Sequence, residues 1–302
     1  MMRFRRSALA FLLPLAASML AWVPCSAEVG VGLSRHGEND AIVGVYILSS
    51  ITEDPDPTSA IWARYNADDE IRYVLNDQGE TNGDGRPSSV LNAVSGLPIV
   101  AWARNGATGF DVVLSTFADG AWTTPVVLAG ATEDELDPFL LVDPIDGTVH
   151  LLYWIDDSWP RVMHREAPAD LSSWSTPIQV SDPGEFAARP AAALHLGELH
   201  VVYEAHTLGP GGTPRQIILA VRNGGSFTSE LLATTGFEGE NWPQVHSGST
   251  RVWVEWIDAD GEITWTRQIE TGSWSAFEVE LFSGLEQREF HVRGTIKGLA
   301  LE

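Results

Sequence analysis

Hydrophobic residues along this chain fall into short runs rich in β-branched and aromatic side chains, each bounded by Gly, Pro, Asn or Asp. No long window shows the 3.6-residue period of an amphipathic helix. Runs of about five to eight residues between turn-forming residues are typical of β-strands. We therefore expect an all-β protein with few helical residues.

The runs recur with a period of about 51 residues, and such internal repeats decide the fold class. Four prolines begin similar segments at spacings of 51, 52 and 53 residues, namely Pro87, Pro138, Pro190 and Pro243. A second run follows each proline and ends 13 to 16 residues later on an aromatic or acidic residue: Trp102, Trp154, Glu204 and Trp256. The same pair of strands is therefore predicted four times.

Each copy continues with two more strands. The third runs lie at 111–117, 161–167, 216–223 and 262–269, and the fourth open on a turn followed by Trp122, Trp174, Phe227 or Trp274. A more divergent first copy supplies runs at 29–34, 41–48, 60–66 and 70–77. The chain is thus predicted to contain five copies of a four-stranded unit, and we expect the aromatic residue of each fourth strand to pack between units.

A four-stranded sheet of this size cannot bury both faces alone, and stacking such sheets around a ring protects their edges. We predict a β-propeller of about five four-stranded blades plus a C-terminal closing segment. The expected blades are 28–80, 81–131, 132–182, 183–235 and 236–284, with closing strands at 285–302. Because 275 residues divided by 51 gives 5.4 repeats, a six-bladed ring completed from both termini is the alternative.

The N-terminus has the pattern of an export signal. Arg3, Arg5 and Arg6 precede an apolar stretch from Ala8 to Val23, and small residues follow at 25–27. We expect a signal peptide at 1–27, a single propeller domain at 28–302, and a secreted or periplasmic protein. The alternative is that Cys25 is the lipidated first residue of a lipoprotein. Cys25 is the only cysteine of the chain and lies in the predicted signal peptide, so the mature chain has no disulfide.

The chain is strongly acidic. It has 18 Lys and Arg against 41 Asp and Glu, and removing the three arginines of the signal leaves 15 against 41, a net charge of −26. Nucleic-acid binding depends on basic residues that neutralise phosphates, so nucleic acid is excluded as a partner. No further run is long enough for membrane insertion. The acidity favours solubility in an external medium, or cation binding.

The repeat resembles that of the sialidase-like, or bacterial neuraminidase repeat, propellers. The resemblance rests on DPFLLVDPIDGTVHLLYW at 137–154 with SSWSTPIQV at 172–180, and on RPAAALHLGELHVVYE at 189–204. The Asp-box of that family remains only in part, at 118–122, and its Arg-Ile-Pro motif only as Arg-Pro at 86–87 and 189–190. The resemblance implies the propeller fold, in a superfamily that includes glycosidases, lyases, lectins and adhesion proteins.

One face of the predicted ring collects the chemistry-bearing residues, because the connections entering first strands and leaving second strands lie there. Around the channel mouth we expect Arg86, Asp137, Arg189 and Trp242, with Arg104, Asp156, Glu204, His206 and Asp258 behind them. Aromatic rings that stack on sugars, beside charged groups that bind hydroxyls, are typical of carbohydrate recognition. Trp102, Trp154 and Trp256 recur at one repeat position, which favours packing between blades over ligand contact.

Three functions fit this face. The leading hypothesis is a secreted, lectin-like propeller that binds an extracellular glycan or polysaccharide. The alternatives are a glycoside hydrolase or polysaccharide lyase on the same face, and a non-catalytic scaffold for protein interactions. The sequence contains no zinc-protease, phosphate-loop, nucleophile-elbow or dinucleotide-binding motif, so we expect no cofactor other than a metal ion.

A calcium ion is the one cofactor the sequence suggests. Glu80, Asn82 and Asp84 alternate with other residues and precede Gly85, as in the first half of a calcium loop. Leu91 stands where an EF-hand has its bidentate glutamate, which excludes an EF-hand. An ordinary turn explains the same residues without an ion.

Overall fold

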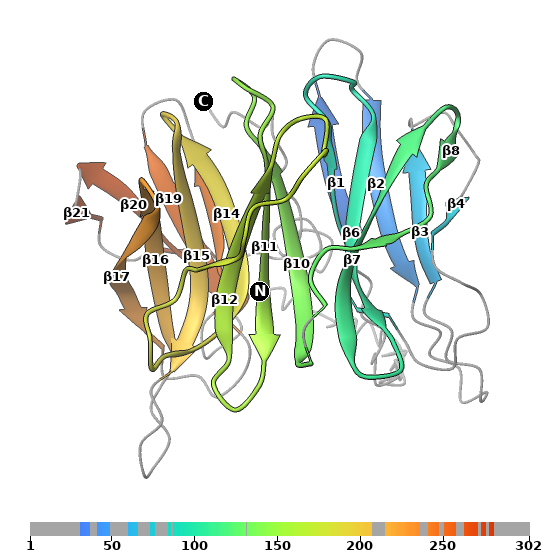
Figure 1. Ribbon diagram of the computed structural model, residues 1–302. Coiled ribbons are helices and arrows are strands. Elements are labelled where there is room, and N and C mark those ends of the chain that lie inside the picture. Colours follow the sequence, from blue (N-terminus) through green and yellow to red (C-terminus); the bar gives the residue numbers. More distant parts are fainter. Residues whose placement is uncertain are drawn as a thin grey trace, which may run out of the picture.

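Five antiparallel sheets make up the part of the chain described by the computed structural model (Figure 1). The described residues are 31–36, 41–48, 60–65, 73–75, 84–85, 87–130, 132–206, 215–235, 241–247, 251–257, 263–270, 273–275 and 278–280. All secondary-structure elements among them are strands. No helix in this part of the chain meets the length and apolarity needed to cross a membrane. The all-β prediction is confirmed.

Each sheet is one blade. Blade 1 contains β1 (Val31–His36), β2 (Ala41–Leu48), β3 (Ala60–Tyr65) and β4 (Tyr73–Val74). Blade 2 contains β5 (Pro87–Leu91), β6 (Pro98–Asn105), β7 (Phe110–Ala118), β8 (Ala121–Trp122) and β9 (Val126–Val127). Blade 3 contains β10 (Asp134–Val142), β11 (Val149–Asp156), β12 (Arg161–Ala167) and β13 (Ile178–Gln179). Blade 4 contains β14 (Phe186–His195), β15 (Glu198–His206), β16 (Gln216–Asn223) and β17 (Ser226–Thr234). Blade 5 contains β18 (Gln244–Ser247), β19 (Val252–Ile257), β20 (Ile263–Glu270), β21 (Ser273–Trp274) and β22 (Glu278–Glu280).

Within a blade the first four strands pair in chain order, while β9 pairs with β7 and β22 with β20. The first strands of successive blades lie beside one another: β1 with β5, β5 with β10, β10 with β14, and β14 with β18. Figure 1 shows the sheets following one another in chain order from blue to red. This is a five-bladed β-propeller, and the residues that the structure describes form no sixth sheet. The predicted signal peptide at 1–27 and closing strands at 285–302 lie outside the described residues.

The core lies between the blades. One cluster joins Leu152 and Val162 of blade 3 to Val201 and Tyr203 of blade 4, and the clusters between other neighbouring blades are built in the same way. Because a second strand is covered on both faces, its sequence is a continuous hydrophobic run without alternation, as in β6 and β11. This explains why these runs dominate the repeat.

The outer strands of blades 2, 3 and 5 are shorter than predicted, whereas β17 of blade 4 has its full length. In blade 3 only Ile178 and Gln179 pair with β12, although the expected run covered 172–180. In blades 2 and 5 two short strands share the fourth position. Very short outer strands expose few unpaired backbone groups and so limit edge-to-edge association.

The repeated aromatic residues pack as expected. Those opening the fourth strands are partly buried against inter-blade clusters: Trp122, Trp174, Phe227 and Trp274. Trp102 and Trp256, which end second-strand runs, are buried in the core. Trp154, at the same repeat position, is only partly buried, because its indole reaches the rim of blade 3.

Candidate functional site

Blades 3, 4 and 5 place the residue before the repeat proline in the left-handed region of φ. Asp137, Arg189 and Trp242 have φ values of 47°, 56° and 47°. In β10 and β14 this residue lies in a β-bulge. A residue before proline normally has an extended backbone. A positive φ at a non-glycine residue costs about 1–3 kcal/mol, so this conformation is found only where the surrounding structure stabilises it. Three such residues at one edge of neighbouring blades mark this rim as a candidate site.

Each rim residue of blades 3 and 4 contacts the residue that ends the predicted second-strand run of its own blade. The Trp154 Nε1–H donates to Asp137 Oδ2 over 2.9 Å. Arg189 Nη1 lies 3.6 Å from Glu204 Oε2. The two pairs occupy equivalent positions in the strand register. In blade 3 the residue before the proline is the acceptor, Asp137, whereas in blade 4 it is the cation, Arg189. Neighbouring blades therefore present a carboxylate and a guanidinium at the same place on the rim.

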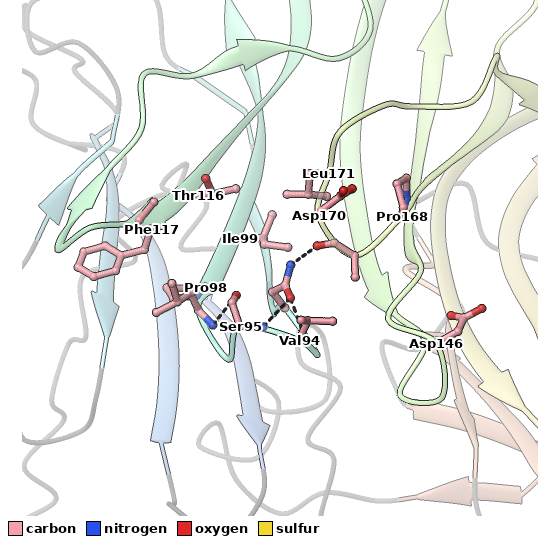
Figure 2. Close-up of a pocket in the computed structure, with 14 residues that line it drawn as sticks. Val94, Ser95, Pro98, Ile99, Thr116, Phe117, Asp146, Pro168, Asp170 and Leu171 are labelled. Carbon is pink, nitrogen blue, oxygen red and sulfur yellow. Dashed lines mark hydrogen bonds between the residues drawn. The ribbon is translucent and has the colours of Figure 1, made fainter.

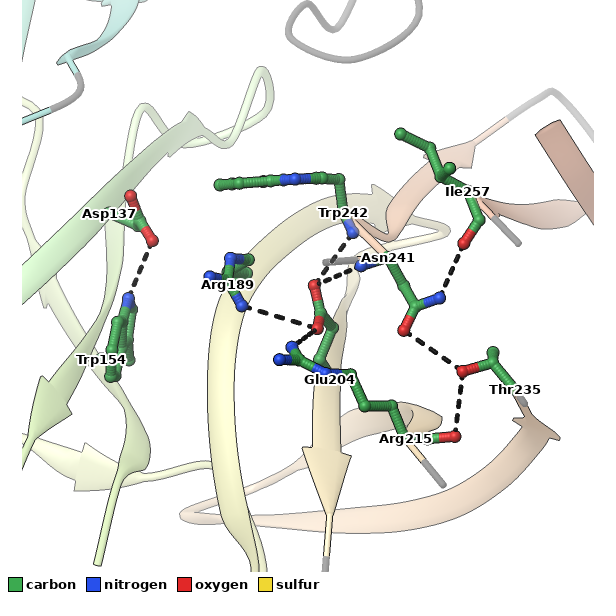
Figure 3. Close-up of polar contacts among 9 residues, drawn as sticks. All are labelled: Asp137, Trp154, Arg189, Glu204, Arg215, Thr235, Asn241, Trp242 and Ile257. Carbon is green, nitrogen blue, oxygen red and sulfur yellow. Dashed lines mark hydrogen bonds and ion pairs between the residues drawn. The ribbon is translucent and has the colours of Figure 1, made fainter. Parts of the chain in front are cut away.

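Glu204 is the centre of a buried polar network (Figure 3). Its side chain receives a hydrogen bond from Arg215 Nη1 over 2.6 Å and from the backbone N–H groups of Asn241 and Trp242 over 3.0 and 2.9 Å. A buried carboxylate is tolerated only when it is paired and hydrogen-bonded in this way. Glu204 thus ties blade 4 to the segment that enters blade 5.

Trp242 is held over the network. The guanidinium of Arg189 lies 4.7 Å from the centroid of the Trp242 ring, a cation–π contact. The preceding residue, Asn241, is buried; its Nδ2 donates to the Ile257 carbonyl over 2.7 Å and its Oδ1 accepts from Thr235 Oγ1 over 3.2 Å. The backbone that presents Trp242 is therefore fixed before any ligand binds.

Asp156 adds a carboxyl group whose proton is retained to higher pH. It lies two residues after Trp154, at the end of β11. Burial raises its pKa, the negative charges of Asp134 and Asp157 raise it further, and the positive charge of Arg189 opposes them. Blade 3 thus offers two carboxyl groups at one rim, and the pKa of one of them, Asp156, is raised.

Aromatic rings continue the site outward. Trp159, 55% exposed, lies 5.0 Å from the ring of Phe186, which lies 5.1 Å from the ring of His206. Burial and the charge of Arg215 lower the pKa of His206, so its imidazole is neutral at neutral pH. A row of neutral rings is a surface on which the C–H faces of sugars stack. We call Asp137, Asp156, Arg189, Glu204, Arg215 and Trp242 the rim cluster, and Trp159, Phe186 and His206 the aromatic row.

The remaining predicted residues divide into two groups. Arg104 lies near the end of β6 in blade 2 and is outside the rim cluster as the structure describes it. Arg86, Asp258, Glu80 and Asn82 lie outside the described residues. The calcium site therefore stays a prediction, with Asp84 its one described member.

Asp84 has a structural role within blade 2. It is buried, its Oδ2 accepts from Trp102 Nε1 over 3.1 Å, and its Oδ1 accepts from the Asn105 backbone N–H over 2.9 Å. Both carboxylate oxygens thus fasten this segment to β6. A calcium ion would have to share these oxygens with the indole and the backbone.

Sequence reasoning missed Arg215, Asn241 and Phe186. Arg215 comes directly before β16, in a connection of the kind expected on this face, so its position was available as a signal. Asn241 acts through its backbone and buried amide, and Phe186 only opens β14. Neither has a sequence pattern that separates it from ordinary loop residues.

A groove lies at the end of the blades opposite the rim cluster, and Figure 2 shows the residues that line it. It is a groove between blades 2 and 3 whose two sides are joined by Asn92 Nδ2, which donates to the Ala169 carbonyl over 2.5 Å. Backbone hydrogen bonds from Thr148 and Ser172 lower the pKa of its two carboxyl groups, Asp146 and Asp170. Both are charged at neutral pH, so neither serves as a proton donor.

Comparison with known proteins shows the fold and not the family. No protein-family model matches the chain, and no curated protein matches it in sequence. Among solved structures, an α-L-arabinanase from Penicillium chrysogenum complexed with arabinobiose superposes with a TM-score of 0.59 at 13% identity, covering 83% of this chain and 80% of the other. A GH93 α-L-arabinofuranosidase from Fusarium graminearum gives 0.58 at 13% identity, covering 83% and 80%.

A thermostable family-43 glycoside hydrolase gives a TM-score of 0.52 at 13% identity, covering 84% of this chain and 93% of its own. At such identity the likeness establishes the β-propeller architecture alone. These three structures are glycoside hydrolases and none is a sialidase. The resemblance to the sialidase-like group therefore holds only at the level of the propeller fold.

Proposed function

We propose that this protein is a glycoside hydrolase that cleaves a glycan at the rim cluster. The observation that carries the proposal is the pair of carboxyl groups on blade 3, Asp156 with a raised pKa and Asp137 fixed by Trp154. Glycoside hydrolysis needs one carboxyl group as acid and a second carboxylate as nucleophile or base. Hydrolysis replaces lectin-like binding as the leading function because the rim holds both groups, and the fold of known glycoside hydrolases supports the choice.

In the proposed reaction Asp156 donates its proton to the glycosidic oxygen as the C–O bond breaks. Asp137 then either attacks the anomeric carbon or takes a proton from the attacking water, depending on the separation of the two carboxyl groups in the sugar complex. The indole of Trp154 keeps the Asp137 carboxylate in one orientation. Water supplies the hydroxyl group of the new reducing end.

Binding is assigned to the groups around the carboxyl pair. Arg189, held by Glu204 and Trp242, donates to sugar hydroxyls, and the exposed ring of Trp159 stacks on a neighbouring sugar. Because Glu204 and the backbone of Asn241 and Trp242 are already hydrogen-bonded, little ordering is required when the glycan binds. These groups are therefore already in place for a glycan.

The experiment is incubation of the purified protein with a panel of polysaccharides that includes arabinan. Release of reducing ends supports hydrolysis. Absorbance from a new double bond would indicate a lyase, and binding without cleavage would return the lectin-like function. The absence of both binding and cleavage would favour a protein-interaction scaffold.

Replacing Asp156 by Asn should lower kcat by about 10²–10⁴-fold, because the leaving oxygen loses its proton donor. A general acid works in its protonated form, so wild-type activity should fall as pH rises through the pKa of Asp156. The raised pKa places this fall above the ordinary aspartate range. A pH profile of kcat/KM measures it, and the alkaline fall should be missing in the variant.

Asp119→Asn is the matched control. Asp119 is exposed at the turn between β7 and β8, and its positive φ of 52° resembles that of Asp137, so the substitution repeats the same chemical change away from the rim. This variant should keep wild-type activity, whereas Asp137→Asn should lose it with little change in folding. Equal activity in Asp156→Asn and Asp119→Asn would refute the assigned acid.

We also propose that the protein is exported, on the basis of the charged and apolar pattern at 1–27. Mass spectrometry of the protein recovered from the native host should find a mature N-terminus near Glu28. Recovery of the chain with Met1 intact would contradict export by this route.

A further inference from the structure

A second cluster of chemistry-bearing side chains lies between blades 3 and 4, at the opposite end of β11 from Asp156. It consists of His150 on β11 and His164 and Glu166 on β12. His150 pairs with Glu166 in the register, and His164 lies opposite Leu152, so the three side chains share one face of the sheet. The rim cluster does not include any of them.

The geometry is close to that of a metal site. His150 Nδ1 and His164 Nε2 are 3.1 Å apart, and Glu166 Oε2 is 4.0 Å from His150 Nδ1. One ligand atom from each of the three residues lies within 4.8 Å of the others. Two nitrogens bound to a tetrahedral zinc ion at 2.0–2.1 Å would be about 3.3 Å apart. The imidazoles already have nearly this separation, and the Glu166 oxygen, within 4.8 Å of both nitrogens, needs to move by at most about 1.5 Å to join them.

Arg222 of blade 4 orients the carboxylate. Its two terminal nitrogens donate to the two oxygens of Glu166, with Nη2 and Oε1 3.1 Å apart. Carboxylate ligands are commonly held by such an outer partner. The positive charge of Arg222 opposes a bound cation, whereas the side chains of Asp143 and Asp146 lie close enough to His150 to add negative charge to its surroundings.

Blade 4 provides an internal comparison. Its register aligns His200 with Val221, and Val202 with Leu219, so the positions of His150, Glu166 and His164 are taken there by His200, Val221 and Leu219. Both blades thus have a histidine at the position of His150, and packing alone can explain it. Only blade 3 adds His164 and Glu166, which together with His150 provide three metal-binding side chains.

We propose that His150, His164 and Glu166 bind one divalent transition-metal ion. Two imidazoles and one carboxylate fit zinc best, with a water molecule in the fourth position. The site lies where blade 3 meets blade 4, since His164 also contacts the ring of Phe227. The ion would add a link between the two strands β11 and β12 and, through Arg222, to blade 4.

Titration calorimetry of the untagged, chelator-treated protein with ZnCl2 tests the proposal. We expect one equivalent to bind, and saturating zinc to raise Tm by about 5 °C, because the ion binds only the folded state. Cobalt should bind at the same stoichiometry and give visible absorbance typical of a tetrahedral site. Magnesium, which requires octahedral oxygen ligands, should have no effect.

His164→Leu copies the residue of blade 4 and should abolish the zinc equivalent, while His200→Leu, the same substitution in that blade, should retain it. Glu166→Gln should weaken zinc affinity at least about tenfold. Because Glu166 is partly exposed, this variant should fold, and it tests the proposal if His164→Leu does not fold. Absence of zinc binding in the wild type, or wild-type zinc affinity in His164→Leu or Glu166→Gln, would overturn the proposal.

Discussion

Replacing Glu204 by Gln should lower the free energy of unfolding by about 3–5 kcal/mol and abolish glycan binding. Glu204 is 2% exposed and pairs with Arg215 and Arg189. The neutral amide would leave both guanidinium groups without their counter-charge and would turn an NH2 group toward a donor. Urea denaturation measures the loss of stability, and calorimetry with the best-bound glycan measures the loss of binding.

Glu198→Gln is the control for this experiment. It lies on the same strand, β15, but its side chain is 65% exposed, and exposed charges contribute little to stability. We expect a change within about 0.5 kcal/mol. If Glu204→Gln were no less stable than Glu198→Gln, the buried network would not be the element that holds the rim of blades 4 and 5.

Replacing Trp102 by Ala should cost about 3–5 kcal/mol, because the ring is completely buried and the blades cannot close the space it leaves. Trp102 packs with Val100, Val113 and Leu75, so it fills the interface between blades 1 and 2. Its loss would also remove the indole donor to Asp84. Thermal and urea denaturation followed by far-ultraviolet circular dichroism measure the effect.

Two variants separate the contributions of volume and hydrogen bonding. Trp102→Phe keeps most of the buried volume and removes only the N–H group, so it should cost less than Trp102→Ala. Trp174→Ala, at a partly buried position of the fourth-strand run, should also cost less. A larger loss in Trp174→Ala than in Trp102→Ala would place the main inter-blade packing at the outer strands instead of the second strands.

The sequence by itself determined the blade architecture. The run ending in Trp102 predicts β6, the run ending in Trp154 predicts β11, and the described strands β12 and β16 match the expected ranges residue by residue. These predictions succeed because strand formation depends on local features: apolar side chains at consecutive positions and turn residues between them. A period of about 51 residues then requires each sheet to cover its neighbour.

The sequence also identified one face of the propeller and several residues on it, because the order of strands decides which connections share an end of the blades. Of the residues predicted there, Arg189, Glu204 and Trp242 contact one another, Asp137 accepts from Trp154 at the equivalent place of blade 3, and Asp156 lies near enough to Arg189 to be influenced by its charge. Arg104, predicted on the same face, lies near the end of β6 in blade 2. Topology places a residue at an end of a blade and leaves its side-chain partners open.

Only the tertiary structure decided the chemistry at that rim. It showed that Glu204 pairs with Arg189 and Arg215 while Trp154, at the equivalent position, donates to Asp137. It also bound Asp84 to Trp102, where the sequence suggested a calcium ligand. Hydrogen bonds, ion pairs and raised pKa values depend on burial and on distances of a few ångströms. The partners of Glu204 lie 11 to 38 residues away in the sequence, and the repeat pattern does not specify their distances or their burial. The hydrophobic pattern therefore decided how the chain folds, and the three-dimensional packing decided which charges meet.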